Sequence, residues 1–519
     1  MSTLLHHVRH PSGPGSVLIT GGRIGWMGRS DQLPELPPGT TVRELRDRLV
    51  LPAFVDAHVH TTETGLSLAG VNLSGVRSAA GMLELVAAAA AARPGQPVVG
   101  HGWDELRITG GLPTAGELDR AAHGADVYLT RVDVHSALVS AGMADRLRLG
   151  HLDGWASTGR VERDAHHAAR KATRFGIGRQ QREQLQRSAL DAAAAAGIAE
   201  VHECAARHIT PEQDLRDLLE LAAAQPVPRV VPYWGELAGS AEDALAIRDR
   251  VLGTAGPGSL AGLAGDLIVD GSFGSHTAAL YAAYADYPGD TGGPGHRGHL
   301  YLDAEAIGRH IRACTLAGLQ AGFHAIGDRG VGAVIEGLER AARALGPQGG
   351  QLLRRAQHRI EHVEGIGPAA LGVLREFGVT ASVQPMFDHE WGGPGGMYEH
   401  RLGSERMKGL NPLAGLQAAG VRLAFGSDSP VTPFGPWQAI RAAVRHHTPQ
   451  HRMAPAQALS AHLGRSPRLR IGDIADLAIW DSPSLDDALA MLIADGIVPS
   501  CLLTLRGGAV IAEEQVTTP

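Results

Sequence analysis

Two histidines set two residues apart, His58 and His60, are the first side chains in this sequence that could bind a metal ion together. They stand at the end of the β-rich run LPAFVDAHV, and side chains two residues apart in a strand point to the same face. Three further residues of the ligand type end later β-rich runs: His324 in AGFHAIGDRG, His362 in RIEH and Asp428 in LAFGSDSP. Imidazole nitrogens and carboxylate oxygens suit Zn²⁺ or a similar divalent ion. The pattern therefore predicts a metal site able to activate water.

The elements that carry these residues must bring them together. The chain repeats one pattern eight times: a short β-rich run, a loop, and an amphipathic helix rich in alanine and leucine. Parallel strands need such helical crossovers, and eight of them close a barrel whose active site lies at the carboxyl ends of the strands. We predict an α/β fold with a (β/α)8 barrel of the TIM type; the alternative is an open doubly wound sheet. The predicted strands cover residues 51–59, 198–202, 229–233, 266–270, 319–324, 358–362, 380–384 and 421–425.

The predicted barrel spans residues 51–469. Two parts of the chain do not follow the strand–helix repeat: one lies inside these bounds, and the other consists of the two ends of the chain. Residues 61–197 are far longer than a crossover and contain the turn-rich segment GWDELRITGGLPT, so we predict an inserted lid or substrate subdomain over the barrel mouth. Residues 1–50 and 470–519 contain short strand patterns such as SVLITGGRI and CLLTL. These patterns predict a small β-sandwich domain built from both termini.

Composition excludes several classes of protein. The 519 residues carry a net charge of -7, so there is no overall basic field to attract nucleic acid. Three cysteines (Cys204, Cys314 and Cys501) are too few for a disulfide framework, which indicates a reducing compartment. The N-terminal residues lack a signal-peptide pattern, and no apolar run reaches the ~18 residues that a membrane helix needs. We expect a cytoplasmic protein whose partner is a small-molecule substrate, with no nucleic-acid or membrane partner.

Several motifs resemble, in the same order, those of the amidohydrolase superfamily of metal-dependent hydrolases: LPAFVDAHVHTTETG, GWDELRITGGLPT, RVDVHSALVS, VDGSFGSHTAAL, HAIGDRG, RIEHVE and GSDSPVTPFGPW. The closer resemblance is to the amidohydrolase-3 branch, which includes N-substituted formamide deformylases. It spans almost the whole chain. The resemblance implies a barrel with a small β-sandwich, and metal ligation by His58, His60, His324, His362 and Asp428. Dimers are common in such families, so a homodimer is a further expectation.

The sequence departs from this branch at the predicted fourth strand. Many members place a lysine four residues before the Asp-Gly of that strand, where it is carboxylated and bridges two metal ions. Here Asp266 stands at that position, and the only lysines, Lys171 and Lys408, lie outside the predicted barrel strands. Three arrangements remain open. Asp266 bridges two ions as an ordinary carboxylate, or Cys204 supplies a thiolate ligand. In the third, a single ion is held by His58, His60, His324 and Asp428, and His362 lies beside these ligands.

The ligand types and the resemblance together predict a reaction. A bound divalent ion lowers the pKa of water toward about 7 and polarises a carbonyl oxygen. Asp428 is predicted to accept the proton of that water and pass it to the leaving atom, with His362 as the second catalytic residue. We expect hydrolysis of a non-peptide C–N bond of the amide or formamide type in a small molecule. The alternatives are an ester or lactone hydrolase, a ring deaminase, and a catalytically silent barrel that acts as a binding protein.

Four residues outside the ligand set are predicted to contact the substrate. His135, in RVDVHS, resembles a position from which the insertion reaches the substrate. His276, in GSFGSHTA, stands where relatives often carry arginine, and could donate a hydrogen bond to a substrate carbonyl or carboxylate. Trp103 and Asp104, in GWDELR, are predicted to line the mouth of the site.

Overall fold

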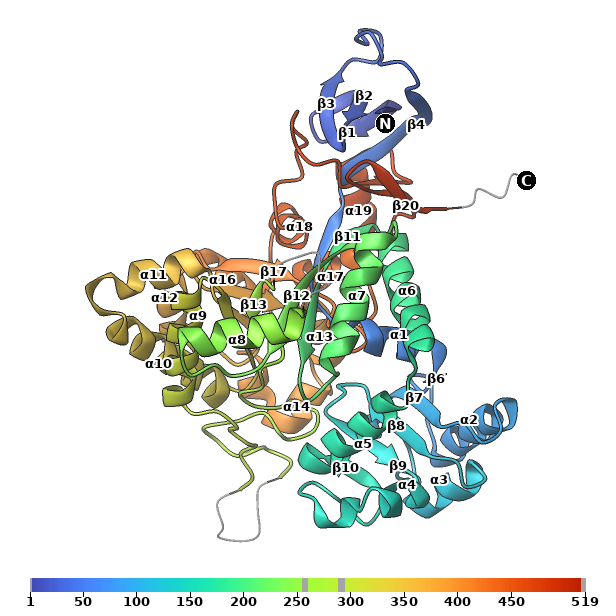
Figure 1. Ribbon diagram of the computed structural model, residues 1–519, viewed down its shortest axis with the longest axis vertical. Coiled ribbons are helices and arrows are strands. Elements are labelled where there is room, and N and C mark those ends of the chain that lie inside the picture. The colour runs from blue at the N-terminus through green and yellow to red at the C-terminus, as the bar shows by residue number, and fades with distance from the viewer. Residues whose placement is uncertain (1, 254–259, 288–294, 515–519) are drawn as a thin grey trace.

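The computed structural model describes residues 2–253, 260–287 and 295–514 of the chain. Three β-sheets organise it: an eight-stranded barrel sheet, a five-stranded sheet inserted after the first barrel strand, and a seven-stranded sheet built from both ends of the chain. Figure 1 shows the seven-stranded sheet at the top and the inserted part at the lower right. In the described parts of the chain, no helix combines the length and apolar character needed to cross a lipid bilayer.

Eight parallel strands form the barrel, in the order β17-β16-β15-β14-β13-β12-β11-β5. They are β5 (Phe54–Val59), β11 (Ile198–Ala206), β12 (Arg229–Gly235), β13 (Gly262–Leu263), β14 (Gln320–Ala325), β15 (Arg359–His362), β16 (Thr380–Val383) and β17 (Arg422–Phe425). The barrel is nearly closed, because the end of β5 meets the segment after β17 through a parallel bridge between Val59 and Ser429. His60 N also donates to Ser429 O at 3.0 Å. The predicted eight-stranded barrel is confirmed.

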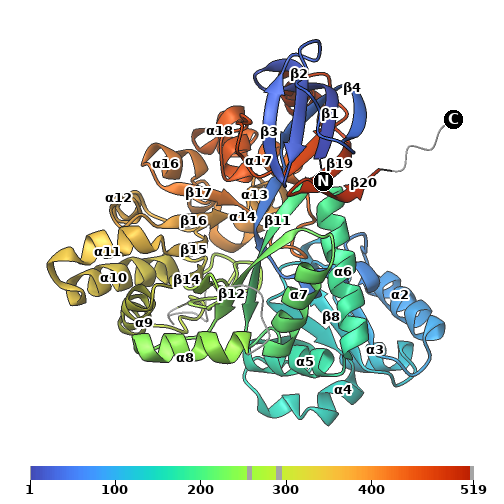
Figure 2. The same ribbon diagram turned by 45° about the horizontal axis from the view of Figure 1, so that its top comes forward.

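Helices cover the outside of the barrel sheet (Figure 2). In α10, the apolar residues Val331, Val334, Leu338 and Ala341 recur every three or four positions, so one face of the helix is buried against the sheet. The helices of this part of the chain are α6 (Arg179–Ala195), α7 (Glu212–Ala224), α8 (Ala241–Leu252), α9 (Ala304–Ala317), α10 (Asp328–Ala344), α11 (Gly349–Ala356), α12 (Pro368–Glu376), α13 (Pro385–Trp391), α14 (Met397–Leu402), α15 (Ser404–Met407), α16 (Leu413–Ala418), α17 (Pro436–Val444) and α18 (Pro455–Leu463).

The predicted position of the fourth barrel strand is wrong. Residues 266–270 form no strand, and Ile268 makes only an isolated bridge; the strand is the two-residue β13 just before them. Gly265 explains the early end of this strand, because its φ is +77° and a Cβ atom there would lie 3.0 Å from Cys204 Cα. The chain turns at Gly265, and Asp266 consequently follows the carboxyl end of β13.

The segment between β5 and β11 contains the five-stranded sheet, in the order β10-β9-β8-β7-β6. Its elements are α1 (Thr61–Ala69), β6 (Val71–Asn72), α2 (Ala79–Ala92), β7 (Val98–Trp103), α3 (Ala115–Ala121), β8 (Val127–Arg131), β9 (Ser136–Val139), α4 (Ala141–Arg146), β10 (Arg160–Glu162) and α5 (Arg163–Phe175). This segment has an apolar core of its own, which includes Met82, Leu118 and Leu129. The inserted part therefore has its own packing, which can hold its loops rigidly.

Strands from both ends of the chain form the seven-stranded sheet, in the order β20-β19-β18-β4-β1-β2-β3. They are β1 (Ser2–His10), β2 (Gly13–Thr20), β3 (Arg23–Gly28), β4 (Thr41–Pro52), β18 (Leu477–Trp480), β19 (Cys501–Arg506) and β20 (Ala509–Glu513), with α19 (Leu485–Asp495) beside them. The sheet surrounds one apolar cluster to which both ends contribute, for example Val17 and Leu505. The predicted first strand, 51–59, is divided, because its first two residues end β4 and the rest forms β5 in the barrel.

Candidate metal centre and active site

Six buried side chains of the metal-ligating type meet at the carboxyl ends of the barrel strands. They are His58 at the end of β5, His60 just after it, Asp266 after β13, His324 in β14, His362 at the end of β15 and Asp428 after β17. Loops and strand ends at this edge of a barrel are where active sites of this fold are built. The structure thus brings together these six predicted ligands; Cys204, the other candidate, lies near them.

The two carboxylates lie between the imidazoles at short distances. Asp266 Oδ1 is 3.4 Å from His58 Nε2 and 3.5 Å from His324 Nδ1. Asp266 Oδ2 is 3.3 Å from His60 Nε2. Asp428 Oδ1 is 3.5 Å from His58 Nε2 and 3.3 Å from His60 Nε2. Two atoms that each lie about 2.1 Å from a tetrahedral zinc ion would be roughly 3.4 Å apart, so these separations fit atoms that share an ion.

Several atoms of the cluster are buried and have no hydrogen-bond partner among the described residues: His58 Nε2, His60 Nδ1, His324 Nδ1, His362 Nε2 and Asp266 Oδ1. Buried polar atoms are nearly always hydrogen-bonded, because leaving one unpaired costs free energy. Five such atoms in one place are therefore unusual. A divalent cation would accept lone pairs from His58 Nε2, His324 Nδ1, His362 Nε2 and Asp266 Oδ1, whereas His60 directs its Nε2 toward the two carboxylates. The donor set fits a metal ion.

The charges in the cluster also favour a cation. Burial, the largest influence, would lower the pKa of His58, but its neighbours Cys204 and then Asp428 raise it well above its ordinary value. The pKa of His60 is raised in the same way against burial, chiefly by Asp266. Burial opposes ionisation of Asp266, yet its pKa lies well below the usual range because of the imidazoles around it, His60 first. The carboxylates thus attract positive charge, which a metal ion would supply.

A glutamine fixes the tautomer of His362. His362 Nδ1 donates to Gln384 Oε1 at 2.9 Å, which leaves the lone pair of Nε2 facing the cluster. Burial, followed by the charge of His324, lowers the pKa of His362 to about 3, so the imidazole is neutral near pH 7. The ring also stacks on Phe387 at 6.0 Å between centroids. His362 is therefore oriented to act as a metal ligand, through a partner that the sequence analysis missed.

A second missed group lies beneath the cluster. His58 Nδ1 bonds to Glu361 Oε2 at 2.9 Å, and Arg359 Nε donates to Glu361 Oε1 at 2.5 Å. Arg359 and Glu361 are two residues apart in β15, so strand alternation points both into the barrel. That alternation was the available signal. The carboxylate orients the His58 ring and directs its Nε2 toward Asp266 and Asp428.

Backbone geometry helps the strand ends to present these side chains. His362 and Asp428 adopt positive φ angles of 73° and 55°. Such conformations cost about 1–3 kcal/mol each for non-glycine residues and persist where surrounding structure requires them. At Gly426 a Cβ atom would lie 2.6 Å from His58 N, so a glycine is needed where the chain after β17 passes β5. This close approach brings Asp428 to the two histidines of β5.

Cys204 lies near the cluster, beside His58 and Glu361. Ligand atoms of Cys204, His58 and Glu361 lie within 4.8 Å of one another. Glu361, however, is held by Arg359, and burial raises the pKa of the Cys204 thiol, which favours its protonated form. Asp266 lies within 3.5 Å of three imidazoles, whereas Cys204 groups only with His58 and Glu361. The geometry therefore favours Asp266 over Cys204 as a shared ligand.

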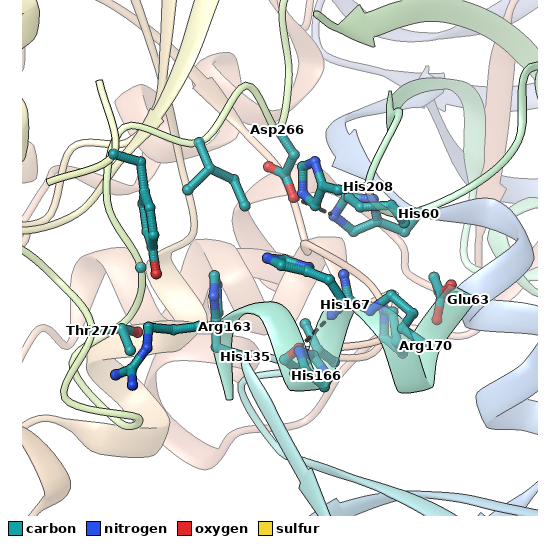
Figure 3. A pocket seen from close by; sticks show the side chains of 16 residues that line it. His60, Glu63, His135, Arg163, His166, His167, Arg170, His208, Asp266 and Thr277 are labelled. Carbon is teal, nitrogen blue, oxygen red and sulfur yellow. Dashed lines mark hydrogen bonds and ion pairs between the residues drawn. The ribbon is translucent and has the colours of Figure 1, made fainter. Parts of the chain in front are cut away.

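Two cavities adjoin the ligand cluster. We call the first the polar chamber; His60 and Asp266 form part of its wall, and Figure 3 shows it from close by. Its other polar residues include His135, Arg163, His166, His167, Arg170 and His208. We call the second the apolar chamber; His324, His362 and Asp428 form part of its wall. Its other residues include Phe273, Ile326, Phe387, Trp391, Met397 and Tyr398. The candidate metal centre thus lies between two spaces of different chemistry.

His135 is the predicted substrate residue that lies at the site. It belongs to the loop between β8 and β9 and lines both chambers. Its ring centroid is 5.1 Å from that of His324. Burial lowers the pKa of His135 to about 4, so its imidazole is neutral near pH 7 and can donate one hydrogen bond.

The other three predicted substrate residues line neither chamber. The Trp103 ring is fully buried in the core of the inserted part, where its Nε1 donates to a backbone carbonyl at 2.8 Å. Asp104 accepts from Arg131 at 3.2 Å. His276 Nε2 pairs with Asp286 at 3.0 Å. Each side chain is committed to a neighbour from elsewhere in the chain, which the local sequence does not reveal.

The polar residues of the chamber that the sequence analysis missed include His166, His167 and Arg170 on α5 and His208 after β11. A signal was available for the first three. Residues three and four apart lie on one side of a helix, so His166, His167 and Arg170 share a face. His208 has no comparable local signal, because only the barrel brings it near α5.

A (β/α)8 barrel with buried imidazoles and carboxylates at its carboxyl end defines a metal-dependent hydrolase. Residues 41–512 match the model of the amidohydrolase family. The chain belongs to the amidohydrolase family.

Similar proteins cover nearly the same length. The protein LONG AFTER FAR-RED 3 of Arabidopsis thaliana is 26% identical over 559 residues, which cover 95% of this chain and 87% of that protein. YtcJ of Bacillus subtilis (strain 168) is 23% identical over 460 residues, covering 85% and 82%. An uncharacterized metal-dependent hydrolase from Pyrococcus furiosus is 27% identical, with a TM-score of 0.69 and coverage of 93% and 100%. One from Pyrococcus horikoshii OT3 is 23% identical, with a TM-score of 0.72 and coverage of 94% and 99%.

Proposed function

We propose that this protein hydrolyses a non-peptide C–N bond, of the amide or formamide type, in a small acyl compound. The proposal takes Zn²⁺ as the metal, because nitrogen and oxygen ligands in this combination suit it. The observation that carries the proposal is the convergence of buried, unpartnered imidazole and carboxylate atoms at the barrel mouth. Membership in the amidohydrolase family supports hydrolysis, and the bond class is what the proposal adds.

The residues present can hold two ions if Asp266 is shared. One oxygen of Asp266 faces His324 and His58, and the other faces His60. A carboxylate with its two oxygens directed at different imidazoles can bridge two cations. Lys171 lies in α5 and Lys408 just after α15, so neither lysine can take this place from a barrel strand. We propose that His58, His60 and Asp428 would hold one ion and His324 and His362 a second, with Asp266 as a ligand that the two ions could share.

The protein side chains supply proton transfer and positioning. When bound, a divalent ion supplies Lewis-acid chemistry, lowering the pKa of water toward about 7 and polarising a carbonyl. Asp428 lines the apolar chamber beside His58 and His60, where its carboxylate can accept a proton from the attacking water. Asp428 then donates that proton to the leaving nitrogen. His362, held by Gln384, keeps a fixed orientation, and His135 can donate a hydrogen bond to the substrate carbonyl.

Metal content tests the shared ligand. We expect about two metal equivalents per chain in the wild type and about one in Asp266→Ala, since two ions would lose their common ligand. Elemental analysis of metal-replete protein after gel filtration gives the count. Asp303→Ala is the matched control, because Asp303 caps α9 on the outside of the barrel. One equivalent in both wild type and Asp266→Ala would replace the two-ion arrangement with a single ion. No metal in either would contradict the proposed function.

The bond class needs a substrate panel. N-formyl and N-acyl compounds should be hydrolysed, and the activity should disappear with a chelator and return with Zn²⁺. Esters and lactones of matched size serve as comparison substrates, because the same ligands can serve those reactions. Turnover restricted to esters or lactones would contradict cleavage of a C–N bond while leaving a metal-dependent hydrolase.

A further inference from the structure

The polar chamber contains a buried arginine, Arg170, that has no directly paired carboxylate among the described residues. Arg170 is 7% exposed, and its Nη2 donates to Val134 O at 2.5 Å. Its Nε is buried without a hydrogen-bond partner, and Arg170 forms no ion pair with any residue that the structure describes. A buried charge without a partner is costly, and proteins normally pair it.

The other buried arginines of the described chain show the usual arrangement. Each has at least one carboxylate partner: Arg131 with Asp104, Arg174 with Glu63, Arg359 with Glu361 and Arg401 with Glu105. The comparison with Arg174 is the most direct, because it lies one helical turn from Arg170 on α5. Glu63 also lines the polar chamber, but Arg174 binds both of its oxygens. The charge of Arg170 also acts on Glu63 and helps to lower the pKa of that carboxyl, after burial and Arg174, but no carboxylate of the described chain pairs directly with Arg170.

Two neutral imidazoles accompany Arg170 in this chamber. His167 Nδ1 and His208 Nε2 are buried and have no hydrogen-bond partner among the described residues, and the two rings lie 5.2 Å apart. Burial lowers the pKa of His167 to about 3 and that of His208 well below its ordinary value. Neutral imidazoles can each donate one hydrogen bond. Figure 3 shows His167, His208 and Arg170 on the side of the chamber near His60.

We propose that the polar chamber binds a carboxylate of the substrate, with Arg170 as its counter-ion and His167 and His208 as hydrogen-bond donors. Arg binds carboxylates through paired N–H groups, Arg170 lines this chamber, and its Nε has no hydrogen-bond partner among the described residues. The chamber wall contains His60 and Asp266, so a carboxylate held there lies beside the candidate metal centre.

The apolar chamber completes the substrate class. Its aromatic wall, including Phe273, Phe387 and Trp391, suits an apolar group. Because the ligand cluster lies between the chambers, a bond cleaved there has the carboxylate on one side and the apolar group on the other. The substrate class is therefore an acyl compound that carries both groups. This inference rests on the proposed function only for the statement that the bound molecule is cleaved.

A binding experiment tests the carboxylate site without requiring turnover. The probes are 3-phenylpropionate and 3-phenylpropionamide, which differ in charge but hardly in shape. Isothermal titration calorimetry on the zinc-loaded protein should show that the acid binds at least tenfold more tightly than the amide, with Kd near or below about 1 mM. In Arg170→Gln the preference should disappear, and in Arg170→Lys part of it should remain because the charge is kept.

Arg163→Gln is the matched control. Arg163 also lines the chamber, but it is bound to Asp153 at 2.6 Å and contacts His299 at 2.9 Å. The preference for the acid should persist in this variant. Equal binding of acid and amide by the wild type, or a preference that survives in Arg170→Gln, would overturn the proposal. The second result is the one expected if the acid binds only the metal ion.

The two proposals can fail separately. If the wild type binds zinc and hydrolyses neutral amides while Arg170 has no effect on acid binding, the carboxylate site is refuted and the proposed function stands. If Arg170 controls acid binding but no metal binds and no C–N bond is cleaved, the proposed function is refuted and the carboxylate site stands. Thermal unfolding of each variant identifies any loss of folding.

Discussion

Two successive layers of polar side chains fill the barrel near its carboxyl end, and they differ in how their polar atoms are used. In the inner layer, Arg359 donates to Glu361 at 2.5 Å and lies 4.4 Å over the ring of Tyr233. At the mouth, His324 Nδ1 and His362 Nε2 are equally buried but lack hydrogen-bond partners among the described residues. The polar groups of the inner layer pair with one another, whereas those at the mouth would find partners only in a bound ligand.

The same contrast occurs on a single helix in the inserted part. Arg174 of α5 is paired with Glu63, and Arg170, one turn away, has no carboxylate partner in the described chain. Folding normally pairs buried polar groups, so a local excess of unpaired ones indicates a function that was selected against stability. Buried polar atoms without a partner therefore distinguish the candidate binding groups at the mouth and on α5 from their paired neighbours.

Among the replacements at the mouth of the barrel, that of Asp428 should have the largest effect on activity. In Asp428→Asn the amide cannot accept the proton of the attacking water, so we expect kcat to fall by roughly 10²–10⁴-fold. Steady-state kinetics on the best substrate of the panel, with metal content measured in parallel, separates lost proton transfer from lost metal. Asp303→Asn, outside the barrel, should keep the wild-type kcat. An active Asp428→Asn protein that retains its metal would remove the acid–base role from this residue.

The paired and unpaired arginines of α5 should also differ in their effect on the free energy of unfolding. Arg174→Met removes the ion-pair partner of Glu63, whose side chain is 15% exposed, and should lower the free energy of unfolding by about 2–4 kcal/mol. Arg170→Met breaks no ion pair in the described chain, so we expect a change of less than about 1 kcal/mol, of either sign. Urea denaturation of both variants measures the difference. Equal losses would mean that the fold compensates the charge of Arg170, which the structure does not show.

Replacement of Gln384 should have a smaller effect, on metal affinity, because Gln384 pairs with the buried ligand His362. In Gln384→Leu, His362 loses the acceptor that fixes its tautomer, and metal affinity should fall roughly 10–100-fold. Competition with a chelating dye gives the affinity. Gln186→Leu is a control of the same type, since Gln186 is fully buried and its Nε2 donates to Thr62 at 3.1 Å and to a backbone carbonyl rather than accepting from a candidate ligand. Unchanged affinity in Gln384→Leu would show that packing alone orients His362.

Much of the architecture was predictable from the sequence, because it depends on local periodicity. Strand and helix patterns alternate along the chain, and this alternation is sufficient to predict an eight-stranded parallel barrel. The same periodicity places His58, His324 and His362 at strand ends. The error at residues 266–270 has a local physical cause, since the positive φ of Gly265 ends the strand before the apolar run begins.

The sequence by itself thus determined the barrel and the residue types available at its mouth. Only the tertiary structure decided which buried groups are paired. Glu361 reaches His58 across 303 residues of chain, and Arg174 reaches Glu63 across 111. The tertiary structure also places Trp103 in the core of the inserted part and Arg170 in the wall of the polar chamber. Periodicity reports the face on which a side chain lies, whereas hydrogen-bond and charge partners depend on the packing of distant segments.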